Sequence, residues 1–339
     1  MTLTRRTFAT AAAALAATPL TAATPRRPIV IAHRGASGER PEHTPAAYRL
    51  AVNQGADFIE PDLVLTKDGV LVVRHENEIA GTTDVASRPE FAARKTSKII
   101  DGETIEGWFA EDFTLAELKT LRTRERLPEL RPASAAFDGR EAIPTFQEVI
   151  DLAKAESQRT GRVIGVYPEM KHPTYLASVG LQIEPRLAEA LKANGLNSRT
   201  APVFVQCFET APLKAFAKLS SARRVRLVGG DARELVTAAG LKDIATYADG
   251  VGPDWSLVIP TVDGALAPAT TLVADAHALG LAVHPWTVRA ENQFLPATLR
   301  RGTDMAAHGD VAAVLTALYA AGIDGVFSDF PGLAAKARG

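Results

Sequence analysis

The sequence predicts an α/β protein folded as one (β/α)8 barrel of the TIM type. Short apolar runs recur along most of the chain, helical patterns separate them, and several runs end in a polar residue. Strand and helix in alternation produce a parallel sheet, and nearly continuous aliphatic runs suit strands that are covered on both faces. Nine runs are candidate strands: 28–35, 57–62, 69–76, 162–171, 202–208, 224–229, 250–254, 281–287 and 325–331.

A barrel has eight places for these nine runs. We expect the run GVGPD at 250–254 to be a short additional segment, with 224–229 as the other possibility. An open, doubly wound sheet is the alternative fold. No G-x-G-x-x-G sequence follows the first run, which argues against the dinucleotide-binding version of that sheet.

The helices are predicted from Ala- and Leu-rich stretches with a helical period. These stretches cover 45–54, 145–155, 183–193 and 267–279. Glycine, which favours the left-handed conformation at a helix C-terminus, stands at or near the ends of several helical stretches: Gly55, Gly195, Gly280 and Gly322. The barrel is expected to span residues 24–339 as a single domain.

The stretch 77–141 departs from the alternation because it is charged and irregular, with one helical pattern around 115–122. Structureless loops of this length are uncommon, so we expect an insertion after the third strand that lies across the barrel mouth. Its aromatic residues stand among carboxylates that would be costly to bury in lipid. We therefore expect a small satellite core around Trp108, Phe109 and Phe113, and no stable membrane insertion.

The first 23 residues are typical of an export signal. Arg5 and Arg6 precede an apolar run at 11–17, and small residues follow at 21–23. This order describes a secretory signal, and the arginine pair resembles the twin-arginine type. We expect cleavage near Ala23 and an exported protein, either periplasmic or secreted.

Composition excludes some classes of partner. Lys plus Arg (38) nearly equals Asp plus Glu (39), so no overall field attracts nucleic acid or an acidic membrane. The single cysteine, Cys207, excludes an intramolecular disulfide. A small-molecule ligand at a local site is the expected partner, and oligomeric state is left open.

Polar residues close four consecutive candidate strands. His33 and Arg34 end the first, Glu60 and Asp62 the second, His75 the third, and Glu169 and Lys171 the fourth. Alternate residues of a strand share a face, so each pair separated by one residue points the same way. Any one of these residues alone would read as a helix cap, a surface charge or a hydrogen-bonded histidine. Their joint placement predicts a site at the barrel mouth.

The chemistry of that set indicates cleavage of a phosphoric ester. Three converging carboxylates would repel one another without a cation, and hard divalent ions prefer such oxygen ligands. Two histidines can transfer protons near neutral pH. Arg34 and Lys171 supply positive charge for an anionic phosphate.

The stretch 33–76 carries further motifs: H-R-G, then P-E-x-T, E-x-D and a T-K-D-G turn before the second histidine. It resembles the signature region of the glycerophosphodiester phosphodiesterase family. YPEMK, VFVQCF, HPWT and GVFSDFP are similar to later parts of that family, so the resemblance covers about residues 29–331. Sequences at 82–86 and 112–121 resemble the insertion of its bacterial exported branch.

The resemblance implies a metal-dependent hydrolysis of glycerophosphodiesters to glycerol 3-phosphate and an alcohol. It makes Glu60, Asp62 and Glu169 the ligands of one divalent cation, Ca²⁺ or Mg²⁺, and His33 and His75 the general acid and base. Arg34 and Lys171 would hold the phosphate and Glu42 would brace them. Two positions depart from the family pattern, Glu76 and Arg289, where Asp and Asn are common.

For three more residues near strand ends, the sequence is compatible with two roles each. Phe208 and Trp286 either pack against the glycerol carbons or belong to the core at the barrel top. Gln206 either donates to a phosphate oxygen or satisfies backbone groups.

Other functions remain as alternatives. A sphingomyelinase-D-like or phospholipase-C-like lyase would use the same barrel chemistry but is expected to carry apolar membrane-binding loops. A non-catalytic exported phosphoglycerol-binding protein is expected to have lost a histidine or a metal carboxylate. A glycoside hydrolase would need paired acids, without two histidines beside Arg and Lys.

Overall fold

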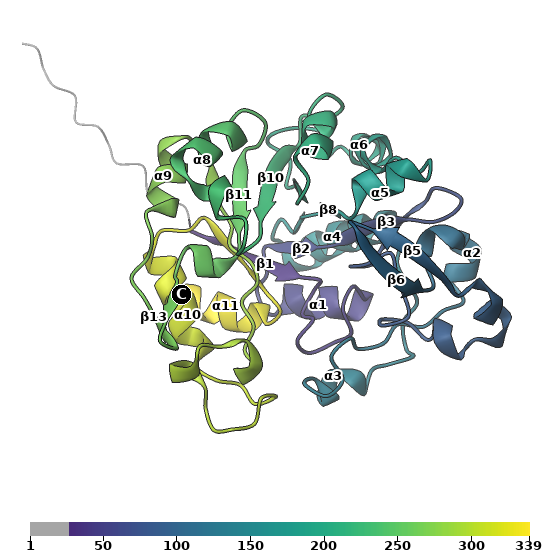
Figure 1. Ribbon diagram of the computed structural model, residues 1–339, viewed down its shortest axis with the longest axis horizontal. Coiled ribbons are helices and arrows are strands. Elements are labelled where there is room, and N and C mark those ends of the chain that lie inside the picture. The colour runs from purple at the N-terminus through teal and green to yellow at the C-terminus, as the bar shows by residue number, and fades with distance from the viewer. Residues whose placement is uncertain (1–26) are drawn as a thin grey trace, which may run out of the picture.

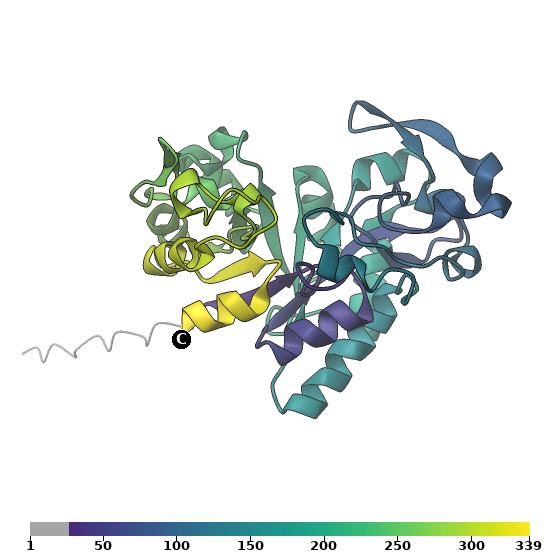
Figure 2. The ribbon, with the colours of Figure 1, turned by 90° about the horizontal axis from the view of Figure 1, so that it is seen from below.

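The computed structural model describes residues 27–339, so the predicted export signal lies outside the described residues. Parallel strands form the centre of the fold and helices surround them (Figures 1 and 2). One sheet has the order β15-β1-β2-β7 and a second the order β14-β11-β10-β9-β8-β3-β4. The central strands are β1 (Ile29–His33), β2 (Phe58–Glu60), β3 (Asp62–Leu65), β7 (Gly165–Val166), β8 (Glu169–Met170), β9 (Phe204–Cys207), β10 (Arg223–Val228), β11 (Gly250–Pro253), β14 (Ala282–Val283) and β15 (Gly325–Ser328).

Isolated parallel β-bridges join the edges of the two sheets and close the barrel. A parallel bridge between Val166 and Val203 links the first sheet to the second. On the other side, Val288 bridges to Ser328 next to β14 and β15. The pairs β2/β3 and β7/β8 each form one continuous barrel position, because β2 pairs with β7 and β3 with β8. The (β/α)8 prediction is confirmed, and the open-sheet alternative is excluded.

The strand at 69–76 was assigned wrongly. β4 (Leu71–Val73) pairs antiparallel with β3, with Leu65 opposite Leu71. Only a tight turn separates the two, in which the Gly69 N–H donates to the Thr66 carbonyl at 2.9 Å. A turn this short cannot make a parallel crossover, which needs a dozen or more residues. The insertion therefore follows an added hairpin strand, and the third barrel position is β7/β8.

The run 250–254 was also assigned wrongly, since β11 is a central barrel strand between β10 and β14. Its glycines are required by the closeness of its neighbours. A Cβ at Gly250 would lie 2.9 Å from the Ala282 carbonyl oxygen, and one at Gly252 would lie 2.8 Å from Leu227 Cδ2. Because Gly250 and Gly252 have no side chains, the neighbouring strands can approach β11 closely. For the same reason this run is less apolar in sequence than the other strands.

Helices cover the outside of the barrel and confirm the predicted stretches, although the helix expected at 145–155 is longer and the helix expected at 267–279 begins five residues later than expected. They are α1 (Pro45–Asn53), α4 (Phe146–Thr160), α5 (Pro173–Ser178), α6 (Ile183–Ala193), α7 (Thr210–Phe216), α8 (Ala238–Ile244), α9 (Leu272–Ala278), α10 (Val311–Ala320) and α11 (Pro331–Arg338). Among the described residues, no helix has the length and apolar character needed to cross a membrane. A small hairpin of β12 (Thr261–Val262) and β13 (Ala265–Leu266) precedes α9.

The insertion packs against the β3–β4 hairpin. It contains the antiparallel hairpin β5 (Thr96–Ile100) and β6 (Glu103–Gly107), the short helices α2 (Leu115–Leu118) and α3 (Pro132–Ala135), and short 3-10 helices. In Figure 1 its β5, β6 and α2 lie at the right and its α3 lies at the lower centre. Trp108 and Phe113 are buried in a satellite cluster with Val64 and Val72 of the β3–β4 hairpin. The predicted satellite core is confirmed for these residues, and Phe109 is buried as well.

The barrel interior below its mouth is filled with aromatic side chains. Tyr167 stacks on Phe204 at 5.0 Å between ring centroids, and Phe58 packs against both rings. The Tyr167 hydroxyl lies 2.8 Å from His284 Nδ1, so the buried polar atoms are paired. This packing closes the barrel from below and leaves the carboxyl ends of the strands as the open end.

Candidate active site

Three buried carboxylates converge at the carboxyl ends of the strands. Glu60 ends β2, Asp62 begins β3 and Glu169 begins β8, and one oxygen of each lies within 4.8 Å of the others. Asp62 and Glu169 are register partners on adjacent parallel strands. Asp62 Oδ1 is buried and accepts no hydrogen bond among the described residues. Converging carboxylate oxygens with a free lone pair fit a hard divalent cation.

Mutual repulsion perturbs the acidity of these groups. Burial and the neighbouring charges of Asp62 and Glu169 raise the pKa of Glu60 well above its usual range. The pKa of Glu169 rises to about 8, mainly through burial and against the attraction of Lys171. Burial also acts to raise the pKa of Asp62, but Lys171 and a hydrogen bond from His43 outweigh it, so its pKa falls well below the usual range. The triad therefore holds protons that a cation would displace.

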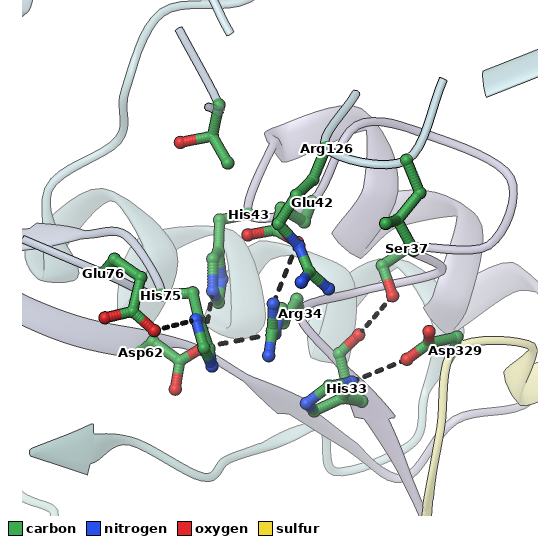
Figure 3. Close-up of polar contacts among 12 residues, drawn as sticks. His33, Arg34, Ser37, Glu42, His43, Asp62, His75, Glu76, Arg126 and Asp329 are labelled. Carbon is green, nitrogen blue, oxygen red and sulfur yellow. Dashed lines mark hydrogen bonds and ion pairs between the residues drawn. The ribbon is translucent and has the colours of Figure 1, made fainter. Parts of the chain in front are cut away.

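Two cations flank the triad, as the sequence predicted. Lys171 Nζ lies 2.8 Å from Glu169 Oε1 and 3.5 Å from Asp62 Oδ1. The Arg34 backbone N–H donates to Glu60 Oε2 at 2.8 Å, and Nη1 donates to Glu42 Oε2 at 3.0 Å. Figure 3 shows Arg34 between Glu42 and Asp62. Glu42 thus braces Arg34 as expected.

The turn after β1 gives Arg34 its position. Arg34 has φ 61° and Gly35 has φ 87°, so two successive residues adopt the left-handed region. A Cβ at residue 35 would lie 2.7 Å from Ala47 Cβ, which explains the glycine. Such strained backbone is found where a functional side chain must be aimed.

His33 hydrogen-bonds to Asp329 just after β15, with 2.6 Å between Nδ1 and Oδ1 (Figure 3). Burial would raise the pKa of Asp329, but Arg131 and Arg289 hold it well below its usual range. An ionised carboxylate only accepts, so His33 donates from Nδ1 and keeps a free lone pair on Nε2. Burial, followed by Arg34, lowers the pKa of His33 to about 4. His33 is therefore a neutral imidazole at pH 7.

His75 has a similar arrangement. Its Nδ1 lies 2.7 Å from Glu76 Oε1, and Glu76 Oε2 lies 2.8 Å from His172 Nε2. His172 Nδ1 in turn lies 2.7 Å from Asp101, at the tip of the β5–β6 hairpin. Burial, together with Arg34 and Lys171, lowers the pKa of His75 to about 3. Glu76, the departure from the family pattern, thus links His75 to the insertion.

These groups line one cavity of about 210 Å³. Phe208 and Trp286 form one wall, with their rings edge to face and 5.4 Å between centroids. Gln206 also lines the cavity, and its Nε2 donates to Glu60 Oε1 at 3.1 Å, so it orients a triad carboxylate instead of satisfying backbone groups. The residues singled out from the sequence are brought together, although Glu60, Asp62 and Glu42 are buried behind the cavity wall and do not line it.

Sequence reasoning missed several residues of this site, including His172 beside Glu76. Asp329 follows β15 and carried the same signal as the others, a polar residue at a strand end. His43 is completely buried, and its Nε2 lies 2.8 Å from Asp62 Oδ2. Arg131 in the insertion reaches Asp329. Nothing local in the sequence distinguishes Arg131 from the other insertion arginines.

Cleavage of a phosphoric diester requires neutralisation of an anion and two proton transfers. The cations Arg34 and Lys171 and the histidines His33 and His75 all line one small cavity at the mouth of the barrel. The fold and the site therefore define a barrel phosphodiesterase.

Comparison with known proteins identifies the family of phosphodiesterases to which the chain belongs. Residues 33–333 match the glycerophosphoryl diester phosphodiesterase family. A glycerophosphodiester phosphodiesterase of Arabidopsis thaliana is 35% identical over 90% of this chain and 84% of its own length, and one of Haemophilus influenzae is 30% identical over 89% and 87%. The chain belongs to this family, as the sequence motifs predicted, and it is an enzyme that hydrolyses glycerophosphodiesters.

Solved structures agree on the fold. A protein described as a glycerophosphoryl diester phosphodiesterase from Silicibacter pomeroyi superposes with a TM-score of 0.66 at 20% identity, covering 93% of this chain and 94% of that chain. A phosphodiesterase from Oleispira antarctica, solved with the product sn-glycerol-3-phosphate, gives 0.61 at 24% identity and covers 91% and 96%.

Proposed function

We propose that the enzyme hydrolyses glycerophosphodiesters with one divalent cation held by Glu60, Asp62 and Glu169. The observation that carries the proposal is the convergence of these carboxylates within 4.8 Å, with Asp62 Oδ1 lacking a hydrogen bond. An all-oxygen donor set suits either Ca²⁺ or Mg²⁺. Such a cation supplies charge stabilisation at the phosphoryl oxygens when bound.

Residues of the chain itself bind the phosphate and transfer the protons. Arg34 and Lys171 bind the anionic phosphate beside the carboxylate triad. One of His33 and His75 removes the proton from the attacking oxygen nucleophile, and the other protonates the alcohol oxygen whose bond to phosphorus breaks. The nucleophile is either water or a glycerol hydroxyl group; in the second case water then opens the cyclic phosphate, so both routes end at glycerol 3-phosphate.

The histidine that acts as the base uses the free lone pair of Nε2, whereas the one that acts as the acid must carry a proton on Nε2 as well as on Nδ1. The carboxylate oxygen beside each Nδ1, 2.6 Å from His33 and 2.7 Å from His75, and the bound phosphate anion stabilise that imidazolium. The products are glycerol 3-phosphate and an alcohol.

The cavity supports small, deacylated substrates. Its volume of about 210 Å³ is below the roughly 300–1,000 Å³ of sites for drug-sized ligands. Phe208 and Trp286 offer an apolar wall for the glycerol carbons. The insertion buries Trp108 and Phe113 in its satellite core and reaches the site through Asp101, so its main aromatic side chains are not available for docking to lipid. Diacyl phospholipids are therefore poor substrates.

The export proposal rests on residues 1–23 alone, which lie outside the described residues. An Arg5→Lys, Arg6→Lys double variant is expected to accumulate as cytoplasmic precursor if the twin-arginine route is used. Unchanged secretion of that variant indicates the general secretory route.

The proposed activity is tested with purified mature protein and glycerophosphocholine, before and after treatment with EDTA. Glycerol 3-phosphate formation is expected to stop on chelation and to return with Ca²⁺ or Mg²⁺. Full activity after exhaustive chelation contradicts the metal assignment. Formation of a cyclic phosphate in place of glycerol 3-phosphate indicates the lyase alternative.

A further inference from the structure

Arg131 belongs to the insertion, yet its side chain lies inside the barrel mouth. It is the N-terminal capping residue of α3, and its backbone N–H donates to the Leu127 carbonyl at 2.8 Å. The side chain is 3% exposed. A guanidinium carries its charge at any physiological pH, so burial at this depth demands carboxylate partners.

Those partners come from two late segments of the barrel. Arg131 Nη2 lies 2.6 Å from Asp329 Oδ2, 198 residues away in sequence, and Nε lies 2.6 Å from Glu291 Oε1. The remaining arm, Nη1, donates to the Ser37 carbonyl at 3.0 Å. The planar fork of Arg131 thus joins the β15 end, the loop after β14 and the turn after β1.

The two carboxylate oxygens of Asp329 have different partners: one contacts His33, the proposed acid–base residue, and the other contacts Arg131. Oδ1 accepts from His33, whereas Oδ2 accepts from Arg131 and, at 3.0 Å, from Arg289 Nε. A carboxylate held at both oxygens cannot rotate, so the direction of the His33 ring is fixed through it. The two arginines also balance Asp329 and Glu291, which leaves no unpaired charge to draw a proton onto His33.

A second route connects Arg131 to the same histidine. Ser37 Oγ donates to the His33 carbonyl at 2.7 Å, and the Ser37 carbonyl is the one that Arg131 Nη1 holds. Figure 3 shows Ser37 in contact with the His33 carbonyl and Asp329 in contact with the His33 ring. Arg131 therefore restrains both the backbone and the ring of His33.

We propose that Arg131 is a positioning residue, through which the insertion fixes the orientation and tautomer of His33 by way of Asp329. The inference rests on the proposed role of His33 in proton transfer. It gives the insertion a part in the chemistry.

Arg94 is the matched control within the insertion. It forms a two-pronged ion pair with Glu117 and donates to the Asp112 carbonyl, all within the insertion. An Arg94→Met variant loses a half-buried ion pair of the insertion, and the contacts of Arg94 among the described residues include neither Asp329 nor Ser37. It reports what general loosening of the insertion does to activity.

The test compares the steady-state kinetics of Arg131→Met and Arg94→Met on glycerophosphocholine with saturating metal. We expect Arg131→Met to lower kcat by ~10–100-fold, the usual effect of removing a group that orients an active-site ligand or base. Its KM is expected to change less than about threefold, because the substrate contacts are intact. Arg94→Met is expected to keep kcat within about twofold. Equal kcat for Arg131→Met and wild type overturns the proposal.

A double-mutant cycle provides a readout that a merely structural role would not move. If Arg131 acts through Asp329, then Arg131→Met adds less than about threefold to the kcat loss of Asp329→Ala. Multiplicative losses overturn the proposal. Should Arg131→Met not fold, Arg131→Lys carries the test, because lysine keeps the charge without the fork. It is expected to lose about tenfold in kcat, and full activity in that variant overturns the proposal.

The same measurements separate this inference from the proposed function. Wild-type kcat in His33→Ala contradicts the assignment of His33 itself. Loss of activity in His33→Ala together with full activity in Arg131→Lys and Arg131→Met contradicts only the role of Arg131.

Discussion

Asp62 and Glu169 stand directly opposite each other on the neighbouring parallel strands β3 and β8, at the open end of the barrel. Their pKa values move in opposite directions. Lys171 and His43 stabilise the charge of Asp62 and lower its pKa, whereas burial raises the pKa of Glu169 to about 8. In the metal-free protein one carboxylate is thus charged and the other is largely protonated at neutral pH. A cation that binds between them must displace a proton.

Metal affinity should consequently rise with pH. Glu60 and Glu169 have raised pKa values without metal, so each binds a proton that the metal-bound state lacks. As pH falls through about 8, the protonated fraction grows and affinity is expected to drop by up to ~10-fold per pH unit for each proton released. Titration calorimetry with Ca²⁺ between pH 6 and 9 measures this slope. An affinity independent of pH in that interval refutes the assignment of the ligands.

Glu169→Gln should separate metal binding from folding. Glutamine resembles the protonated carboxyl group that already predominates at pH 7, so the Tm in EDTA is expected to change by less than ~2 °C. The rise in Tm that Ca²⁺ produces in the wild type should disappear, because that rise comes from binding to the folded state. A variant that retains the full calcium-dependent shift excludes Glu169 as a ligand.

Substitution of either histidine should remove activity while leaving the metal site in place. His33→Ala and His75→Ala are each expected to lower kcat by ~10²–10⁴-fold, the range for loss of a positioned acid or base. Calcium affinity should stay near the wild-type value, because no contact joins these rings to the triad among the hydrogen bonds of the described residues. Near wild-type turnover in one variant would make that histidine structural.

β11 offers a test of the barrel assignment. A Cβ at Gly250 meets the Ala282 carbonyl oxygen of the neighbouring strand at 2.9 Å, and backbone cannot move aside easily. Gly250→Ala is expected to lower the free energy of unfolding by about 1–3 kcal/mol. Gly81→Ala is the control, since nothing lies within 4 Å of its added Cβ. Chemical denaturation measures both, and equal stabilities would disagree with the tight pairing of β11.

Substrate selection follows from the ordered insertion. Trp108 and Phe113 are buried in the satellite core of the insertion, and Ile99 is the large apolar side chain that the described insertion exposes. Glycerophosphocholine and glycerophosphoethanolamine are expected to be turned over at similar rates, and phosphatidylcholine vesicles at least ~100-fold more slowly. Comparable rates on vesicles would favour a membrane-docking lyase or phospholipase.

Much of the fold and site could be predicted because the signal lies in short stretches. The strand ends carry the polar residues, and period-two alternation places Glu60 beside Asp62 and Glu169 beside Lys171. The two errors in strand assignment have local causes. The run at 69–76 looks like a barrel strand but follows a turn too short for a crossover, and the glycines of β11 hide a central strand.

Other features could not be predicted because they depend on long-range contacts. Arg131 meets Asp329 across 198 residues, and its sequence neighbourhood resembles that of other insertion arginines. His43 is buried against Asp62 because the turn after β1 folds back over the triad. Such relationships arise only once the barrel closes.

The central claim is that a cation in the carboxylate triad enables cleavage of a glycerophosphodiester to glycerol 3-phosphate. The most direct measurement follows glycerophosphocholine by ³¹P NMR with metal-stripped wild type, the same protein with Ca²⁺ or Mg²⁺ restored, and Asp62→Asn with the same ions. The account predicts a glycerol 3-phosphate signal only for the wild type with metal. Product formed by the stripped enzyme or by Asp62→Asn at the wild-type rate would contradict it, as would a cyclic phosphate as the final product.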